Sequence, residues 1–210
     1  MSEFTLVIGT KSFSSWSLRP WLAMKMAGVN FEEIVIPLRR PETAAAIARH
    51  SPGGKVPVLK HGTRVIWESI AILEYLAEML PNERLWPVDV AARAQARCIS
   101  AEMHAGFQAL RTNMSMDLRA SAPGQGMTPE VAQDIARITH IWRECRERFG
   151  AEGPFLFGRF CNADAMWAPV VTRFETYGVE LDDVCRAYCR TILDLVPMRE
   201  WYAAARAEPV

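Results

Sequence analysis

The sequence predicts a mixed α/β part followed by an all-helical part. The first 80 residues alternate short strand-like and helix-like segments, whereas the remainder is nearly all helix-like. Composition changes near the same place, because all four lysines lie in the first 60 residues and all seven aspartates lie at or after Asp89. Two prolines and several polar residues at 81–87 are typical of a linker. We therefore expect one domain over 1–80, a linker over 81–89 and a helical domain over 90–210.

The first part contains alternating elements that predict a small mixed sheet with helices on both faces. Short apolar, β-rich runs indicate strands, and segments closed by Gly28 or the breaker His50–Gly54 indicate helices. A turn at 61–63 joins two short strands as a hairpin. The expected elements are strand 4–8, helix 16–27, strand 31–38, helix 42–49, strands 56–60 and 64–67, and helix 69–79.

The second part reads as a series of amphipathic helices. One long pattern runs over 91–119 and places Met103, Phe107, Leu110 and Met114 on one stripe. A Pro/Gly-containing loop follows at 121–128. The further helices are expected over 129–149, 162–177, 182–195 and 197–207.

Composition narrows the class of function. Lys+Arg and Asp+Glu both number 24, and this balance argues against a nucleic-acid partner. No apolar run approaches the ~18 residues of a membrane span, and the N-terminal residues lack a basic secretory n-region. The five cysteines form no Cys-x-x-Cys pair and the four histidines are scattered, so we expect reduced thiols and no metal site. These observations favour a cytoplasmic protein without membrane partners.

The turn between the first strand and the first helix is rich in serine, reading Ser12-Phe13-Ser14-Ser15-Trp16-Ser17. Unpaired N–H groups and the positive dipole end favour an anion at a helix N-terminus. A hydroxyl there is able to donate to a thiolate and to lower the pKa of that thiol, about 8.5 when free. N-capping by Ser14 or Ser15 is the simpler alternative. The turn holds no cysteine, which argues against thiol–disulfide exchange.

A second candidate segment, Lys55-Val56-Pro57, opens the third strand, where proline donates no ladder hydrogen bond. If the peptide bond before Pro57 is cis, the Val56 backbone turns outward and is able to pair with an extended peptide. A trans proline at the start of an edge strand is the alternative.

The third candidate segment is Glu68-Ser69, where the fourth strand meets the third helix. The Ser69 hydroxyl and the N–H groups beside it would hold a carboxylate, and Glu68 would take an ammonium group. Together they fit the zwitterionic head of an amino acid. Helix capping alone is again the simpler alternative.

These segments together resemble the glutathione S-transferases over nearly the whole chain. Ser12 and Arg19, seven residues apart, are similar to the serine-type segment of the tau and zeta classes. The resemblance rests on four segments in the family's order and spacing: Ser12 to Arg19, Lys55-Val56-Pro57, Glu68-Ser69, and Phe155-Leu156-Phe157-Gly158 with Ala163-Asp164. It implies a thioredoxin-like N-terminal domain in the order βαβαββα, an all-helical substrate-binding domain and a homodimer.

The resemblance also implies roles for single residues. Ser12 would stabilise the thiolate of glutathione, the co-substrate, with Ser15 and then Ser14 as rivals. The glutathione site would comprise Lys55 for the glycine carboxylate, the backbone of Val56 before Pro57 for the cysteinyl part, and Glu68 with Ser69 for the γ-glutamyl head. No prosthetic group is implied.

The second substrate would be a small hydrophobic electrophile or a peroxide. Its wall is expected on the first long helix, from Met103, His104, Phe107 and Arg111, although core packing and a solvated face are the alternatives for these residues. A non-catalytic glutathione-binding or interaction module with the same fold is the alternative function.

The sequence departs from the family pattern in three places. Phe13 and Ser14 stand where the zeta class has a serine and a cysteine, which weakens a maleylacetoacetate isomerase assignment. Cys161 replaces the usual Ser or Thr N-cap, at a cost of about 1 kcal/mol unless Asn162 substitutes. The bulky Trp16, Trp21 and Trp67 either narrow the site or fill the core of the first domain.

Overall fold

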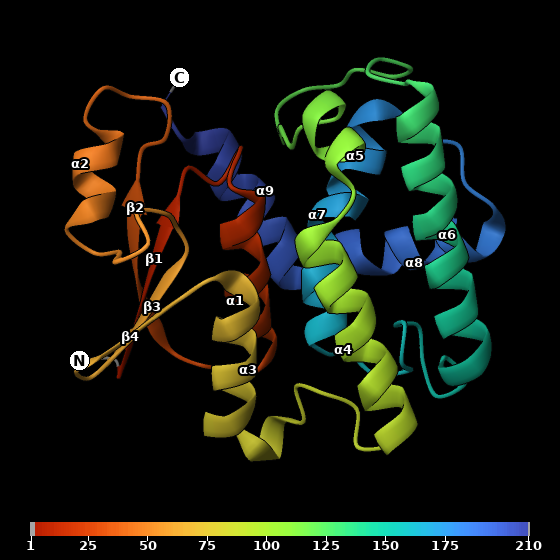
Figure 1. The fold of residues 1–210 in the computed structure, drawn as a ribbon, viewed down its shortest axis with the longest axis horizontal. Helices are drawn as coiled ribbons and strands as arrows, with labels where there is room; N and C mark the ends of the chain where they lie inside the picture. The colour runs from red at the N-terminus through yellow and green to blue at the C-terminus, as the bar shows by residue number, and fades with distance from the viewer. Residues whose placement is uncertain (1–2, 210) are drawn as a thin grey trace.

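The computed structural model describes residues 3–209, in which a small sheet with its helices stands beside a larger array of helices (Figure 1). The elements of the first part are β1 (Phe4–Gly9), α1 (Ser15–Met26), β2 (Phe31–Ile36), α2 (Thr43–Ala48), β3 (Val58–His61), β4 (Arg64–Trp67) and α3 (Ser69–Met79). Their order confirms the expected mixed α/β arrangement. Among the described residues, no helix is long and apolar enough to cross a membrane.

The sheet has the strand order β2-β1-β3-β4. β1 pairs in parallel with β2 and antiparallel with β3, and β3 pairs antiparallel with β4. Alternation along β1 decides which helices cover which face, because successive side chains point to opposite sides. Leu6 and Ile8 belong to the core that includes α1 and α3, whereas Val7 packs with Ile47 of α2 on the other face (Figure 1).

The second part is all-helical, as expected. Its elements are the short 3-10 helix η1 (Pro81–Glu83), α4 (Val90–Ala105), α5 (Gln108–Asn113), α6 (Pro129–Phe149), α7 (Asn162–Tyr177), α8 (Asp183–Leu193) and α9 (Val196–Ala207). Asp89 begins α4 by accepting a hydrogen bond from the Ala92 N–H at 2.8 Å.

The single helix expected over 91–119 is wrong, because the chain breaks between α4 and α5. Gly106 is extended, and Phe107 adopts the left-handed conformation with φ 60°. The Arg111 guanidinium closes the break by donating to the Met103 carbonyl and, at 2.8 Å, to the Gly106 carbonyl. A side chain five residues beyond Gly106 thus satisfies carbonyls that the helix leaves unpaired at its end.

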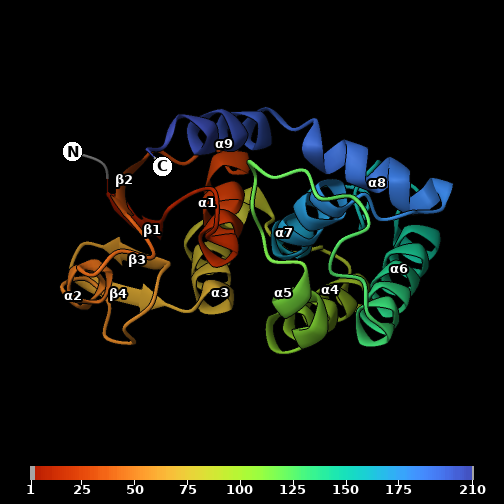
Figure 2. The ribbon, with the colours of Figure 1, turned by 90° about the horizontal axis from the view of Figure 1, so that it is seen from above.

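The contacts that join the helical array to the sheet part include a hydrogen bond from α7 and an aromatic contact from α9. The buried Asn162 side chain donates to the Leu73 carbonyl in α3 at 3.0 Å. At the far end of the chain, α9 lies beside α1 (Figure 2), where the Trp201 and Trp21 rings are 4.9 Å apart. Trp21 is therefore a core residue, 2% exposed.

The start of α7 keeps its cap despite the cysteine. Cys161 occupies the N-cap, and Asp164 accepts a hydrogen bond from its N–H at 2.9 Å. Asp164 also accepts from the Leu156 N–H at 3.2 Å and the Tyr188 hydroxyl at 3.1 Å. Cys161 and Asp164 thus form a reciprocal capping box, and the Asn162 side chain is used elsewhere.

Candidate functional site

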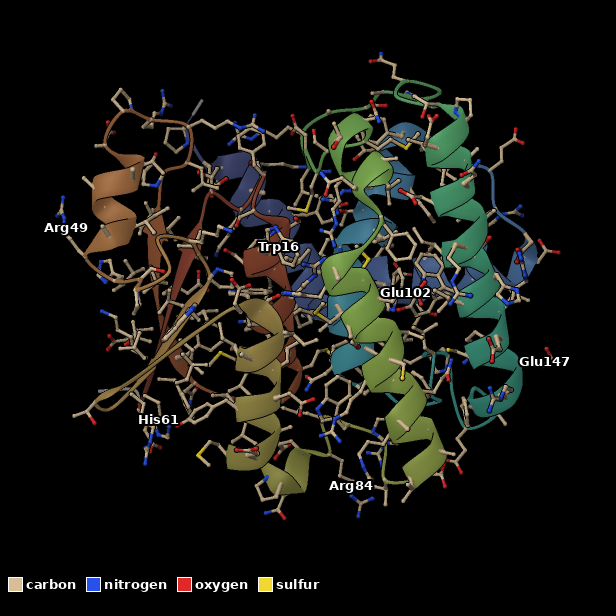
Figure 3. All side chains as sticks on the ribbon, in the orientation of Figure 1. Trp16, Arg49, His61, Arg84, Glu102 and Glu147 are labelled. Atoms are coloured by element: carbon tan, nitrogen blue, oxygen red, sulfur yellow. The ribbon has the colours of Figure 1, made fainter. Side chains whose placement is uncertain are left out.

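A cavity of about 380 Å³ lies between the sheet part and α4. Its lining includes all five residues of the expected glutathione site: Lys55, Val56, Pro57, Glu68 and Ser69. Trp16 of α1 and His104 of α4 also line it, as do Gly53 and Trp67. Trp16 stands where α1 faces α4 (Figure 3). The tertiary structure thus brings α1, residues 53–57, residues 67–69 and α4 together around one cavity.

The Val56–Pro57 peptide bond is cis. The first paired residue of β3 is Val58, so Val56 precedes the ladder. Among residues 3–209, no recorded hydrogen bond uses the backbone N–H or carbonyl of Val56. These backbone groups face no strand and remain available to an extended peptide.

Glu68 has an uncommon backbone conformation, and Ser69 has a hydroxyl without a hydrogen-bond partner in the described chain. Glu68 has φ 67° and ψ 124°, a backbone region that costs a non-glycine residue about 1–3 kcal/mol. Ser69 is the first residue of α3, and its buried hydroxyl has no hydrogen-bond partner within the described chain. An unpartnered donor at a helix N-terminus is suited to a carboxylate.

The three candidate serines differ in where their hydroxyls point. Ser12 is fully buried, and its Oγ, which has one proton to donate, lies 2.9 Å from Glu208 Oε2 and 3.0 Å from the Ala205 carbonyl oxygen. The Ser14 Oγ lies 2.7 Å from the Ser17 Oγ. The hydroxyl of Ser15, the first residue of α1, has no recorded hydrogen bond to any residue in 3–209. The Ser12 hydroxyl is thus engaged by the C-terminal segment, and Ser12 is not among the residues that line the cavity.

The expected electrophile wall is brought together only in part. His104 lines the cavity, 3.8 Å from the Glu68 carboxylate. Met103 is fully buried in the core, and Phe107 is 7% exposed with its ring 5.7 Å from Trp167. The structure therefore places these two residues in the core, as the alternative had it. Arg111 stacks on the Trp16 ring at 4.6 Å from the centroid.

Two features, one in the cavity wall and one beside Trp16, could not be predicted from the sequence. Gly53 lies so close to the Trp67 ring that an added Cβ would be 3.1 Å from Cδ1. The Gly53-Gly54 pair signals a turn, but not this contact. Arg19 is fully buried with its guanidinium 4.1 Å from the Trp16 ring centroid, and a charged residue inside a helix gives no sign of such burial.

Larger cavities lie elsewhere and lack these features. One of about 880 Å³ lies between the linker and the end of α6, and another of about 680 Å³ lies between α7 and α8. Neither has an unpartnered buried donor in its lining, among the described residues. Over the same residues, no group of three or more His, Cys, Asp or Glu side chains is placed to hold a metal ion.

Comparison with known proteins decides the family. A family model for the N-terminal domain of glutathione S-transferases matches residues 13–79. The maleylacetoacetate isomerase of Rattus norvegicus is 37% identical over 175 residues, which cover 81% of this chain and 78% of the relative. The chain belongs to the glutathione S-transferase family. A probable maleylacetoacetate isomerase of Caenorhabditis elegans is 38% identical over 100 residues, 48% of this chain and 46% of that relative.

Solved structures of glutathione S-transferases share the fold. A maleyl pyruvate isomerase, a bacterial zeta-class glutathione S-transferase, superposes with a TM-score of 0.75 at 22% identity, covering 98% of this chain and 100% of that chain. A glutathione transferase homologue of Burkholderia, solved with bound glutathione, has a TM-score of 0.73 at 21% identity, covering 98% and 99%. The fold is therefore the thioredoxin-like N-terminal domain with a helical C-terminal domain that these proteins have.

Proposed function

We propose that this glutathione S-transferase family member binds glutathione in the 380 Å³ cavity and activates its thiol for attack on a small electrophile or peroxide. The observation that carries the proposal is the convergence of Lys55, Val56, Glu68 and Ser69 on one cavity beside the start of α1. The relatives are enzymes by name, which favours catalysis over a non-catalytic binding module.

Each part of glutathione has a partner of matching chemistry in this proposal. The N–H groups at the start of α3 and the Ser69 hydroxyl bind the α-carboxylate of the γ-glutamyl head, and Glu68 binds its ammonium group. The backbone of Val56 pairs with the cysteinyl part, and Lys55 binds the glycine carboxylate. The thiol then lies near the N-terminus of α1.

Ser15 is the serine that this proposal assigns to the thiolate. Its hydroxyl is uncommitted, whereas those of Ser12 and Ser14 are hydrogen-bonded within the protein. A donated hydrogen bond and the positive end of α1 both favour the charged form of the thiol. Ionising a thiol with a pKa of about 8.5 at neutral pH and holding it against an electrophile supplies the catalysis.

The electrophile, a homodimer and a cytoplasmic location belong to the same proposal. The electrophile would enter beside Trp16 and His104, which line the cavity next to the glutathione wall. A homodimer would run in size-exclusion chromatography with light scattering at twice the 23.6 kDa of one chain.

Calorimetric titration tests the proposal directly. We expect the protein to bind reduced glutathione and its S-hexyl derivative in the micromolar to low-millimolar range. Ser69→Ala should weaken both, whereas Ser100→Ala should not, because the buried Ser100 hydroxyl donates within α4 to the Ala96 carbonyl. Absence of binding by either compound at millimolar concentration would exclude a glutathione site here.

A further inference from the structure

The turn between β1 and α1 is hydrogen-bonded to the other end of the chain, which lies beside the sheet (Figure 2). The N–H groups of Lys11 and Ser12 donate to the two carboxylate oxygens of Glu208, that of Ser12 at 3.1 Å. The Lys11 carbonyl accepts from the Trp201 indole N–H at 3.1 Å. The Ser12 carbonyl accepts from the Leu118 N–H at 3.2 Å. All four backbone polar groups of these two residues thus have partners in the helical part.

The same turn leads directly to Ser15, the serine proposed to activate the thiol. The N–H groups of Phe13 and Ser14 donate to the Thr10 carbonyl at 3.1 and 2.9 Å. The Ser15 N–H donates to the Phe13 carbonyl at 3.0 Å, and Ser15 is the first residue of α1. Because these bonds fold the chain back on itself, a displacement of the turn carries the Ser15 hydroxyl and the first N–H groups of α1 with it.

Glu208 is itself fixed where it meets the turn. Its side chain is 15% exposed, and the Arg119 guanidinium lies 3.9 Å from its carboxylate. Arg119 also donates to the Ala205 carbonyl at 2.9 Å and to the Glu208 carbonyl at 2.7 Å, so it holds the end of α9. The Lys11 ammonium group is paired with Glu33 at 2.6 Å. The Glu208 carboxylate therefore meets the turn through its N–H groups and not through the lysine charge.

We propose that Glu208 is a positioning residue for the activation of the glutathione thiol, because its carboxylate fixes the turn that places Ser15 and the first N–H groups of α1. Glu208 is not among the residues that line the cavity, so it acts through the turn. The strength of a hydrogen bond falls steeply when its geometry is lost, so a loosened turn donates poorly to the thiolate. This inference rests on the proposed function, because it concerns the same thiol.

The carboxylate has two effects on the thiol, and they have opposite signs. As a negative charge it disfavours a nearby thiolate, so its removal through charge alone would lower the pKa of the thiol. As an anchor it holds the donors that stabilise the thiolate, so its removal would raise that pKa. The N–H groups that donate to the carboxylate and the guanidinium of Arg119 offset its charge. We therefore expect the anchoring effect to prevail.

Glu208→Ala tests the sign of the effect. We expect the pKa of bound glutathione, followed by the ultraviolet absorbance of the thiolate against pH, to rise by about one unit. The ionisable side chains that line the cavity, Lys55, Glu68 and His104, are unchanged in this variant. Binding of S-hexylglutathione, which has no thiol to ionise, should keep its wild-type affinity in calorimetry. An unchanged or lowered pKa in Glu208→Ala would overturn the proposal.

The pH dependence of kcat distinguishes positioning from a loss of folded protein. In the reaction with 1-chloro-2,4-dinitrobenzene, the thiolate forms a C–S bond and chloride leaves with the electron pair of the C–Cl bond. At a pH below the thiol pKa, a rise of one unit leaves about one tenth of the thiolate, so kcat of Glu208→Ala should fall about tenfold. At a pH above the raised pKa, kcat should return to the wild-type value. A kcat lowered equally at every pH would overturn the proposal, because that is the effect of partial unfolding.

Glu200→Ala is the matched control. Glu200 is also on α9 and its carboxylate also reaches α1, where it pairs with the Lys25 ammonium group at 2.7 Å. Lys25 lies in the last turn of α1, however, away from the turn that places Ser15. The control should therefore leave the pKa of bound glutathione unchanged. A shift as large as that of Glu208→Ala would overturn the assignment, because any loosening of α9 would then have the same effect.

Two milder variants test the proposal if Glu208→Ala does not fold. Glu208→Gln keeps the size of the side chain but replaces one acceptor oxygen with an NH₂ group, which is unable to accept from an N–H group. Arg119→Met releases the backbone at the end of α9 but leaves the carboxylate in place. Both should raise the pKa of bound glutathione by less than Glu208→Ala does. The absence of a rise in both variants would overturn the proposal.

Amide hydrogen exchange separates this inference from the proposed function, because it needs no ligand. The N–H groups of Lys11 and Ser12 should exchange faster in Glu208→Ala than in the wild-type protein, since they lose their acceptors. Glu200→Ala should leave their exchange unchanged. If the wild-type protein binds no glutathione, the proposed function fails, and the exchange rates still decide whether Glu208 holds the turn. Equal rates in Glu208→Ala and the wild-type protein would overturn the anchor.

Discussion

The Ser12 hydroxyl donates to the Glu208 carboxylate at 2.9 Å, and the same carboxylate accepts the backbone N–H groups of Lys11 and Ser12. The C-terminal end of the chain therefore holds the turn that leads into α1. Arg119 supports this contact by donating to the Glu208 carbonyl at 2.7 Å. Ser12, for which the sequence resemblance implied the catalytic role, acts in this structure as an anchor for that turn.

The first prediction follows from this anchor. Ser12→Ala should lower the free energy of unfolding by about 1–2 kcal/mol, because it leaves the Glu208 carboxylate short of one hydrogen bond. Denaturant unfolding measures this change. Thr191→Ala, which removes an exposed hydroxyl bonded within its own helix, is the control and should be near neutral. A stable Ser12→Ala protein that has lost the bound thiolate would instead return the catalytic role to Ser12.

The second prediction concerns the activation of the thiol. Ser15→Ala should raise the pKa of bound glutathione by about one to two units, the value of a lost hydrogen bond to a charged group. The ultraviolet absorbance of the thiolate, followed against pH, measures that pKa. Ser14→Ala is the matched control, since its hydroxyl is bonded to Ser17. A larger shift in Ser14→Ala than in Ser15→Ala would contradict the assignment.

The third prediction separates binding from backbone strain at Glu68. Glu68→Ala and Glu68→Gly both remove the carboxylate and should weaken glutathione binding equally. Glycine tolerates φ 67°, so Glu68→Gly should be more stable than Glu68→Ala by about 1 kcal/mol. Calorimetry and denaturant unfolding on the two variants give the two quantities. Equal stabilities would show that this conformation carries no strain.

The fourth prediction is a pH dependence that originates in Asp164. Burial raises the pKa of this carboxyl to about 6, despite the hydrogen bonds that it accepts. The folded protein therefore holds this proton to a higher pH than the unfolded chain, whose aspartate pKa is about 3.9. Stability is highest below pH 4 with respect to this group and falls as the pH rises toward 6, by about 3 kcal/mol in total.

Asp164→Asn isolates that contribution from the other carboxylates. The stability of the wild-type protein minus that of the variant should fall by about 2 kcal/mol between pH 4 and pH 7, because the unfolded aspartate is already half ionised at pH 4. Urea unfolding of both proteins across this range supplies the comparison. A difference that is constant with pH would mean that Asp164 titrates alike in the folded and unfolded chains.

The fifth prediction is that one thiol reacts in the native protein. Cys98 is exposed, whereas the other four cysteines are buried. Burial raises the pKa of Cys145, Cys185 and Cys189 to about 12, which suppresses the reactive thiolate. An aromatic disulfide reagent should label one thiol per chain without denaturant and five with it. Cys98→Ser should abolish the native reaction, and rapid labelling of a second thiol would contradict the burial.

Many elements were predictable because their signals are local. The structure has α3, α6 and α7 at the predicted bounds, where a serine as first helical residue, a proline at the first turn or a following glycine marks an end. The positions of Lys55, Val56, Glu68 and Ser69 around one cavity follow from motif spacing on this fold. The break at Phe107 was not predictable, because a left-handed phenylalanine has no compositional signal.

Periodicity and motif spacing, which are local features of the sequence, thus predict the order of elements, the family and the residues of the proposed glutathione wall. Contacts between distant segments decide the remainder. Glu208 reaches Ser12 across 196 positions and so directs one serine away from the cavity. The buried Arg19 donates to the carbonyl of Met166, which lies 147 positions further along the chain. Such assignments require the packed structure, because the energy of a buried hydroxyl or guanidinium depends on which partners surround it.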